Sequence, residues 1–275
     1  MRAGILGVMG VLLVSGPASG QQSSEPVPLT IGETFTITSA VLGETRTINV
    51  YRPSFYGDTA DTRRPVLYMP DGGIGEDFIH VAGLVQISVM NGTMRPFLLV
   101  GIENTERRRD LTGPTEVAED RTIAPRVGGS AAFRQFIRTE LMPAIDARYP
   151  TTDERAIVGE SLAGLFIVET FLLEPDLFDT YIAFDPSLWW NDGHLVKRGA
   201  ELLQTGKQAS KTLYLATSNE ETLKGLADEF VGMLGAQSSG AVTWHYLEME
   251  EESHATIYHP AALEAFRRLF KPGPS

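Results

Sequence analysis

The residues RAIVGESLAG, at positions 155–164, contain the strongest structural signal in this chain. An apolar run, Arg155–Val158, comes before the serine, and a helix-like run, Leu162–Leu173, follows it. This order predicts a strand, a sharp turn with Ser161 at its tip, and then a helix. Such a turn exposes the serine hydroxyl and places the Leu162 amide at a helix N-terminus, where it can hold an oxyanion. The simpler alternative is a glycine-led turn in which Ser161 only caps the helix.

The composition is that of an ordinary globular protein. The chain has 275 residues, of which 43% are hydrophobic and 21% are charged, enough for one α/β domain with a full core. The formal net charge of −12 argues against nucleic acid or an anionic membrane surface as a partner. The chain has no cysteine, which excludes disulfides, thiolate metal sites and N-terminal lipid attachment.

Residues 1–20 have the pattern of a signal peptide. A short positive start, Met1-Arg2, precedes an apolar stretch, Ile5–Val14, and a small-residue cleavage site, Ala18-Ser19-Gly20. The apolar stretch is too short to anchor the chain across a bilayer. We therefore predict a signal peptide at 1–20, a flexible leader at 21–28, and export to the periplasm or the medium. No integral membrane segment is expected in the mature chain.

Beyond the leader, strand-like and helix-like runs alternate. Thr34–Val41 and Thr45–Tyr51 alternate threonine with apolar residues and predict an antiparallel hairpin. An amphipathic helix is expected over Ala132–Tyr149, with a kink or an early stop at Pro143. The alternation predicts one α/β domain over 29–272, with a mostly parallel sheet and helices on both faces. The other predicted strands are short apolar runs at Pro65–Met69, Pro96–Ile102, Arg155–Val158, Tyr181–Phe184, Thr212–Ala216 and Val242–Leu247.

Polar residues follow several of these strands, at the edge where parallel sheets bind their ligands. Ser161 ends one strand, Glu220 and Glu221 follow Thr212–Ala216, and His254 follows the last strand. Serine, acid and histidine in this order are typical of the α/β-hydrolase triad. In such a triad the imidazole takes the serine proton, and the carboxylate orients the imidazole and stabilises its charged form.

Two of these roles have more than one candidate. Among five histidines, His254 is preferred as the base because it lies in a loop directly beyond the last strand. His259, at the start of the last helix, is its alternative. The acid is Glu221, Glu220 or Asp185, each of which follows a predicted strand. The two glutamates could equally be solvated residues in the first turn of a helix.

Five short motifs strengthen this interpretation when they are taken together. With them, the chain from Val66 to about Phe270 resembles the putative esterase family of the α/β-hydrolase superfamily, which includes siderophore esterases, esterase D and mycolyltransferase-like hydrolases. The resemblance implies a serine-dependent carboxylic ester hydrolase that acts through an acyl-enzyme on Ser161. The motifs are Leu67–Gly73, Val100–Asp110, the Ser161 turn, Pro186–Trp190 and Glu252–Ala255.

The resemblance also implies roles for single residues. Gly73 and Leu162 match the positions whose backbone N–H groups form the oxyanion hole in the family. Glu221 is favoured as the acid because the family's acid lies a few residues past its strand. The chain differs from many members at Glu160, where they have histidine, and at Ala163, where they have glycine. The first difference places a negative charge beside the nucleophile.

Trp189, Trp190 and Arg109 are the predicted substrate contacts. One of two adjacent tryptophans is expected to be buried, while the other can form an apolar wall of the cleft. Arg109 ends the run Arg107–Arg109, which begins a segment without periodicity that extends to Val127 and is predicted to form a flap. Such a run is commonly solvated, but an arginine at the rim can orient a carboxylate or a polar ester.

Other functions would use the same features. An acyltransferase needs the same triad, a siderophore lactone is a candidate substrate, and a catalytically silent member would only hold a ligand in the cleft. No metal or organic cofactor is expected, because the chain has no cysteine, no His-Glu-x-x-His motif and no histidine pair at helical spacing. The predicted partner is a small-molecule ester, and the sequence does not define the oligomeric state.

Overall fold

The structure, a computed structural model, describes residues 25–204, 206–237 and 242–273. Residues 25–31 form no helix or strand, and a separate compact unit begins at Gly32. The predicted signal peptide, 1–20, lies outside the described residues, as does the first half of the leader. No helix in the described ranges is long and apolar enough to cross a membrane.

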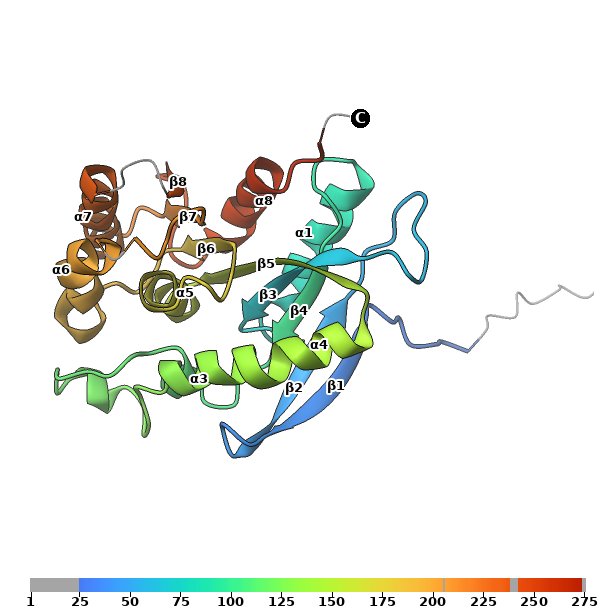
Figure 1. The fold of residues 1–275 in the computed structure, drawn as a ribbon, viewed down its shortest axis with the longest axis horizontal. Coiled ribbons are helices and arrows are strands. Elements are labelled where there is room, and N and C mark those ends of the chain that lie inside the picture. The colour runs from blue at the N-terminus through green and yellow to red at the C-terminus, as the bar shows by residue number, and fades with distance from the viewer. Residues whose placement is uncertain (1–24, 205, 238–241, 274–275) are drawn as a thin grey trace, which may run out of the picture. The chain divides into compact units, whose positions relative to one another are not determined.

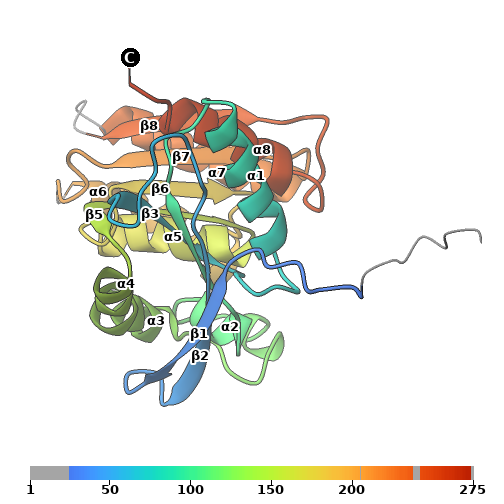
Figure 2. The same ribbon diagram turned by 90° about the vertical axis from the view of Figure 1, so that its right-hand side faces the viewer.

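One eight-stranded sheet forms the centre of the described unit (Figure 1). The strand order is β1-β2-β4-β3-β5-β6-β7-β8, and in Figure 2 the sheet extends from β1 and β2 at the bottom to β8 at the top. The β1–β2 and β2–β4 pairs are antiparallel, and every other neighbouring pair is parallel. The strands are β1 Glu33–Ser39, β2 Glu44–Tyr51, β3 Arg64–Pro70, β4 Leu98–Ile102, β5 Thr151–Glu160, β6 Thr180–Phe184, β7 Thr212–Thr217 and β8 Thr243–Glu248.

Helices cover both faces of the sheet (Figures 1 and 2). Helices α1 and α8 contact each other and cover one face, whereas α3, α5, α6 and α7 cover the other. A short 3-10 turn, Asp120–Thr122, lies between α2 and α3. The α-helices are α1 Phe78–Met90, α2 Arg107–Asp110, α3 Ser130–Phe136, α4 Met142–Arg148, α5 Leu162–Leu173, α6 Trp190–Leu203, α7 Glu221–Gln237 and α8 Tyr258–Leu269.

The apolar runs explain why the sheet is covered on both sides. In β3, Val66 and Tyr68 belong to one core, and Leu67 and Met69 belong to the other, because successive residues of a strand point to opposite faces. All four are fully buried. A continuous apolar strand is stable only where helices shield both faces. The predicted α/β fold, with its antiparallel hairpin before a mostly parallel sheet, is therefore confirmed.

The predicted helix Ala132–Tyr149 is present, but a π-helical turn divides it. Between α3 and α4, residues 137–141 form this turn, and the Met142 N–H donates to the Ile137 carbonyl five residues back. Pro143 follows in the first turn of α4, where its missing N–H is tolerated. The structure thus has a π turn in place of the expected kink or stop, and the helix continues to Arg148.

Candidate active site

Ser161 stands on a strained turn between β5 and α5. Its backbone angles, φ 62° and ψ −120°, lie in a region that favours glycine. The Ser161 N–H donates to the Phe184 carbonyl at 3.0 Å, and the Ser187 N–H donates to the Ser161 carbonyl at 3.1 Å. A Cβ at Gly159 would lie 2.6 Å from the Cβ of Ala163. The small residues of the motif are therefore needed because the chain folds back on itself here.

His254 links this serine to a buried carboxylate. Its Nε2 lies 3.2 Å from Ser161 Oγ, and its Nδ1 lies 3.1 Å from Asp185 Oδ2. The Asp185 side chain is fully buried, whereas 41% of the His254 side chain is exposed. The three residues follow β5, β6 and β8, at the carboxyl edge of the parallel strands. A hydroxyl, an imidazole and a carboxylate linked in this order by hydrogen bonds can move a proton away from the hydroxyl.

Contacts from the neighbouring strand hold the Asp185 carboxylate in place. The Ser218 N–H donates to Oδ1 at 2.7 Å, and the Ser218 hydroxyl donates to Oδ2 at 2.6 Å. The backbone N–H of Asp185 donates to the carbonyl of Ala216, near the end of β7, at 2.8 Å. These bonds offset the cost of burying a charge, and they aim the remaining lone pairs at the imidazole.

The prediction that Glu221 is the carboxylate beside His254 is wrong. Glu221 begins α7, is exposed, and makes no hydrogen bond or ion pair to His254 among the described residues. Glu220 is also exposed and acts on His254 only through its charge. Asp185, the third candidate, is the one that meets the imidazole. The loops after β6 and β7 both satisfy the serine–acid–histidine order, so chain order alone does not separate them.

Glu160 brings a second carboxylate to the same imidazole. Its Oε1 lies 3.2 Å from His254 Nδ1, and 16% of its side chain is exposed. Burial raises the pKa of Glu160 to about 7, although the positive charges of His254 and Arg107 act in the opposite direction. The pKa of His254 is raised above its usual value, first by the hydrogen bond to Asp185 and then by the charges of Glu160, Asp185 and Glu220, against the effect of burial.

The two expected oxyanion donors differ in their surroundings. Leu162 begins α5, and the first N–H groups of a helix have no partner within the helix. The Gly73 N–H, in contrast, donates to Glu76 Oε2 at 2.7 Å. The same carboxylate accepts from Asn104 Nδ2 at 2.9 Å. Gly73 can therefore meet an oxyanion only after the Glu76 side chain moves away.

Arg107 and Arg109 bind carboxylates in different parts of the structure. Arg107 donates from Nε and from a terminal nitrogen to the two oxygens of Asp71, at 2.7 and 2.8 Å, and so fixes the loop after β3. Arg109 pairs with Glu44 and Asp110, and only 12% of its side chain is exposed. These carboxylates occupy its guanidinium, so the structure does not support Arg109 as a substrate contact.

The two tryptophans also differ. Trp190 is 4% exposed and its Nε1 donates to the Gly113 carbonyl at 2.9 Å, so the structure does not support it as a substrate contact. Trp189 is 37% exposed and lines a small cavity of about 210 Å³ with Val196 and Leu226. Of the pair, Trp189 is accessible and Trp190 is buried, as expected for two adjacent aromatic residues.

The segment predicted as a flap is tied to the turn that begins α6. Asn191 Oδ1 accepts the Glu116 N–H at 2.9 Å, and the Asn191 N–H donates to Asp120 Oδ2 at 2.8 Å. Asn191, Asp192 and Gly193 have φ of 50°, 54° and 66°, so this turn is left-handed throughout. These hydrogen bonds therefore depend on left-handed backbone angles, which few residue types adopt.

The sequence did not indicate the roles of two hydroxyl groups, those of Ser187 beside Ser161 and Ser218 beside Asp185. Ser187 is 3% exposed, and its Oγ lies 3.5 Å from Ser161 Oγ. Ser218 holds the Asp185 carboxylate, as described above. A lone serine carries no sequence signal, but Ser218 directly follows β7 and Ser187 lies three residues after β6, and a position just after a parallel strand is where ligand-binding residues gather.

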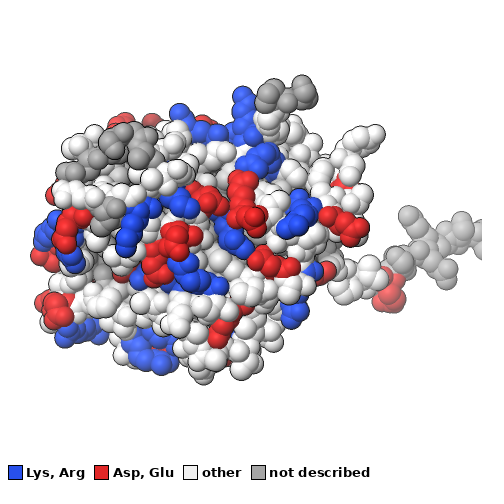
Figure 3. Space-filling model, viewed as in Figure 1, with Lys and Arg blue, Asp and Glu red and all other residues white. Residues whose placement is uncertain are grey.

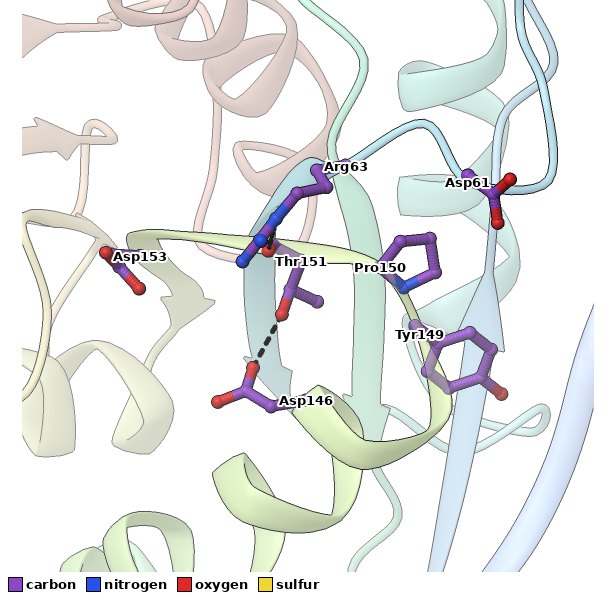
Figure 4. A pocket seen from close by; sticks show the side chains of 7 residues that line it. All are labelled: Asp61, Arg63, Asp146, Tyr149, Pro150, Thr151 and Asp153. Atoms are coloured by element: carbon purple, nitrogen blue, oxygen red, sulfur yellow. Dashed lines mark hydrogen bonds between the residues drawn. The ribbon is translucent and has the colours of Figure 1, made fainter.

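A separate cavity of about 420 Å³ lies at the opposite edge of the sheet, beside the starts of β3 and β5 (Figure 4). Its acidic groups include Asp61, Asp146 and Asp153, and Thr151 Oγ1 donates to Asp146 at 2.7 Å. No cluster of three or more histidine or acidic side chains in the described residues could hold a metal ion. On the molecular face in Figure 3, acidic and basic side chains are interspersed.

Comparison with known proteins gives a consistent result. A family model described as "Putative esterase" matches residues 39–255. The chain is 28% identical over 200 residues to the ferri-bacillibactin esterase of Bacillus subtilis, covering 65% of this chain and 69% of that protein. It is 30% identical over 199 residues to the siderophore triacetylfusarinine C esterase of Aspergillus fumigatus, covering 66% of this chain and 64% of that protein.

Solved structures show the same similarity. An IroE-like serine hydrolase from Shewanella oneidensis matches with a TM-score of 0.79 at 28% identity, covering 87% of this chain and 80% of that chain. A siderophore hydrolase of Aspergillus nidulans matches with a TM-score of 0.75 at 21% identity, covering 91% of this chain and 99% of that chain. The second likeness concerns the fold alone.

Proposed function

The chain belongs to the putative esterase family, and from that premise we propose that it hydrolyses carboxylic esters through an acyl-enzyme on Ser161. Membership of this family makes it an enzyme that acts on esters. The observation that carries the proposal is the position of His254, with Nε2 3.2 Å from Ser161 Oγ and Nδ1 3.1 Å from Asp185.

In the acylation step, Ser161 Oγ attacks the ester carbonyl carbon while His254 Nε2 removes the hydroxyl proton. Asp185 accepts the Nδ1–H and stabilises the imidazolium that forms. The Leu162 N–H donates to the tetrahedral oxyanion, and the Gly73 N–H joins it once the Glu76 side chain has moved away. His254 then gives the proton to the alcohol oxygen, the carbon–oxygen bond breaks, and the acyl group remains on Ser161.

Deacylation repeats these steps with water. His254 takes one proton from a water molecule, the resulting hydroxide adds to the acyl carbon, and the proton returns to Ser161 Oγ as the acid leaves. The exposed imidazole gives water access to this step, which favours hydrolysis. An alcohol in the place of water would give acyl transfer by the same residues.

The test is active-site labelling combined with turnover of a neutral ester. A fluorophosphonate should label Ser161 stoichiometrically, and the label should be located by peptide mass spectrometry. Ser161→Ala should lose both the label and the hydrolysis of p-nitrophenyl butyrate. Ser187→Ala is the matched control because its hydroxyl lies beside the nucleophile, and this variant should still be labelled at Ser161. Stoichiometric labelling of another residue in the wild type would contradict the proposal.

A second candidate function is the hydrolysis of siderophore esters. Its support is that two curated relatives are named as siderophore esterases. The exposed Trp189 offers an aromatic surface for such a ligand. Mass spectrometry of triester and trilactone siderophores, with and without iron, should show hydrolysis by the wild type and none by Ser161→Ala. Turnover of simple esters with all siderophores left intact would reject this substrate class.

We also propose that the protein is exported, on the residues of the N-terminal segment described above. The expected mature start is Gln21. Expression in a bacterium, followed by fractionation and N-terminal sequencing, tests this proposal. Full-length protein that remains in the cytoplasm with Met1 or Arg2 at its start would contradict it.

A further inference from the structure

Glu160 contacts the catalytic histidine, and the mechanism above assigns it no step. It is the last residue of β5 and directly precedes Ser161. Its Oε1 is 3.2 Å from His254 Nδ1, the nitrogen that also lies 3.1 Å from Asp185 Oδ2. The Asp185 contact is a hydrogen bond and the Glu160 contact is an ion pair, so this nitrogen has two carboxylates beside it, whereas a triad requires only one.

The contacts of Glu160 are confined to the active site. Among the described residues, His254 is the only partner with which its side chain forms an ion pair or hydrogen bond. The side chain is mostly buried, with 16% of it exposed. A buried carboxylate that served only to stabilise the fold would be expected to bond to neighbouring backbone or to an arginine. Its position therefore indicates a role toward the imidazole.

The charged groups around Glu160 come from several elements. His254, from the loop after β8, and Arg107, from α2, favour the ionised carboxylate. Asp185, after β6, and Asp77, before α1, oppose it, and burial opposes it most strongly. Burial raises the pKa of Glu160 to about 7, so this group titrates in the same pH range as a histidine.

His254 is surrounded by carboxylates from three parts of the chain. Asp185 and Glu160 contact its ring, and Glu220 acts on it through space. Each of these negative charges favours the imidazolium, whereas partial burial of the ring opposes it. Two of them, Asp185 and Glu160, lie within reach of the same nitrogen.

We infer that Glu160 is a positioning residue that acts through His254: its charge lies beside the Nδ1 that Asp185 holds by a hydrogen bond, stabilises the imidazolium, and sets the pH above which the enzyme is active. This inference rests on the proposed function, in which His254 is the general base. The charge of Glu160 makes proton release from the imidazolium harder, because an opposite charge in contact favours the charged form. Activity then requires a higher pH, but the imidazolium of the transition state is better stabilised.

The decisive variant is Glu160→Gln, which keeps the shape and removes the charge. The pH dependence of kcat/KM for p-nitrophenyl butyrate should be measured from about pH 5 to pH 9. The acid limb should move to lower pH by about one unit or less, since Glu160 is itself partly protonated in this range. The plateau should fall by roughly 3- to 10-fold, because the transition state loses one stabilising charge.

Glu220→Gln is the matched control, because Glu220 acts on the same imidazole without contacting it. It should move the limb by no more than a few tenths of a pH unit and leave the plateau nearly unchanged. Glu160→Asp keeps the charge at a greater distance, and its limb should lie between those of wild type and Glu160→Gln. This variant also serves if the glutamine variant does not fold.

An NMR titration of the His254 ring in the resting enzyme separates this inference from the proposed function. The midpoint should be lower in Glu160→Gln than in wild type, whether or not a substrate is turned over. Loss of activity with an unchanged acid limb and an unchanged midpoint would reduce Glu160 to a structural residue and overturn the inference. Retained turnover in Ser161→Ala would overturn the proposed function, while the titration would still decide the role of Glu160.

Discussion

The turns that carry Ser161 and Asp185 are similar in geometry and different in sequence. They follow neighbouring parallel strands, β5 and β6, and both residues have positive φ, 62° and 39°. The Ser161 turn is marked by Gly159 and Ala163, which must be small because they would touch. The Asp185 turn has no such mark, and residues on the next strand connection, led by Ser218, hold its side chain in place.

The comparison teaches that the two members of one site are specified in different ways. The bend at the nucleophile needs small residues two places before and two places after it, and backbone hydrogen bonds to Phe184 and Ser187 then support it. The position of the acid depends on hydrogen bonds from a distant segment, and those bonds exist only when the sheet has formed. Substitutions in the two turns should therefore show how far activity depends on small residues near Ser161 and how far it depends on hydrogen bonds to Asp185 from a distant segment.

The largest effect is expected at the nucleophile itself. Ser161→Ala should lower kcat by about 10⁴-fold or more, and His254→Ala should be equally damaging, since the two act as a unit. Circular dichroism and thermal melting should show a folded protein, because the hydroxyl makes no contact on which the core depends. Turnover within tenfold of wild type in either variant would break the assignment.

The second-largest effect on turnover is expected at Asp185. Asp185→Asn should lower kcat by roughly 10³- to 10⁴-fold, because the amide favours the wrong imidazole tautomer and cannot stabilise the imidazolium. Glu221→Gln is the control, as its exposed carboxylate does not reach the histidine, and it should retain wild-type kcat/KM. The reverse outcome, with loss in Glu221→Gln and full activity in Asp185→Asn, would restore the acid predicted from the sequence.

Gly159→Ala tests whether the turn that carries Ser161 needs a small residue at position 159. The added methyl would lie 2.6 Å from the Cβ of Ala163, so the backbone of the turn must shift. We expect kcat/KM to fall by about 10- to 100-fold through misplacement of the hydroxyl, and unfolding to become easier by about 1–3 kcal/mol. Denaturant titration with steady-state kinetics checks both. Wild-type values for both quantities would show that the turn does not depend on a small residue here.

Ser218→Ala tests the tertiary control of the acid and should have the smallest catalytic effect. It removes the hydroxyl donor to Asp185 Oδ2 and leaves the backbone donor to Oδ1. A loss of about tenfold in kcat is expected, with a stability cost of about 1–2 kcal/mol from the less satisfied buried carboxylate. If Ser218→Ala were as damaging as Asp185→Asn, this one bond would determine the whole position of the acid.

The fold could be predicted from the sequence because its signals are local. Most of the continuous apolar runs form a strand within one or two residues of the expected bounds, although β5 begins at Thr151, four residues before the predicted Arg155. The run Leu162–Leu173 forms α5 with those same ends. The hairpin followed from alternation of polar and apolar residues around Gly43, whose φ is +67°. The π turn before Pro143 was not foreseen, because proline indicates a disturbance of the helix but not its form.

The site was only partly predictable, and the errors have one physical cause. Glu221 and Asp185 both follow a parallel strand, and nothing in the chain near either one tells which loop turns toward the histidine. Arg107 and Arg109 are two places apart, but α2 directs one to Asp71 and the other to Glu44. In each case the answer lies in contacts between segments that are far apart in the sequence.

The backbone of Ser161 has a consequence for the stability of the whole protein. A serine at φ 62° and ψ −120° costs of order 1–3 kcal/mol relative to a relaxed backbone, and glycine would avoid most of that cost. Ser161→Gly should therefore raise the melting temperature while it abolishes turnover. The free energy concerned is a sizeable fraction of the margin by which a domain stays folded. Selection for the reaction thus works against selection for a stable fold at this one residue, and a lineage that no longer needed the ester would become more robust by losing its nucleophile.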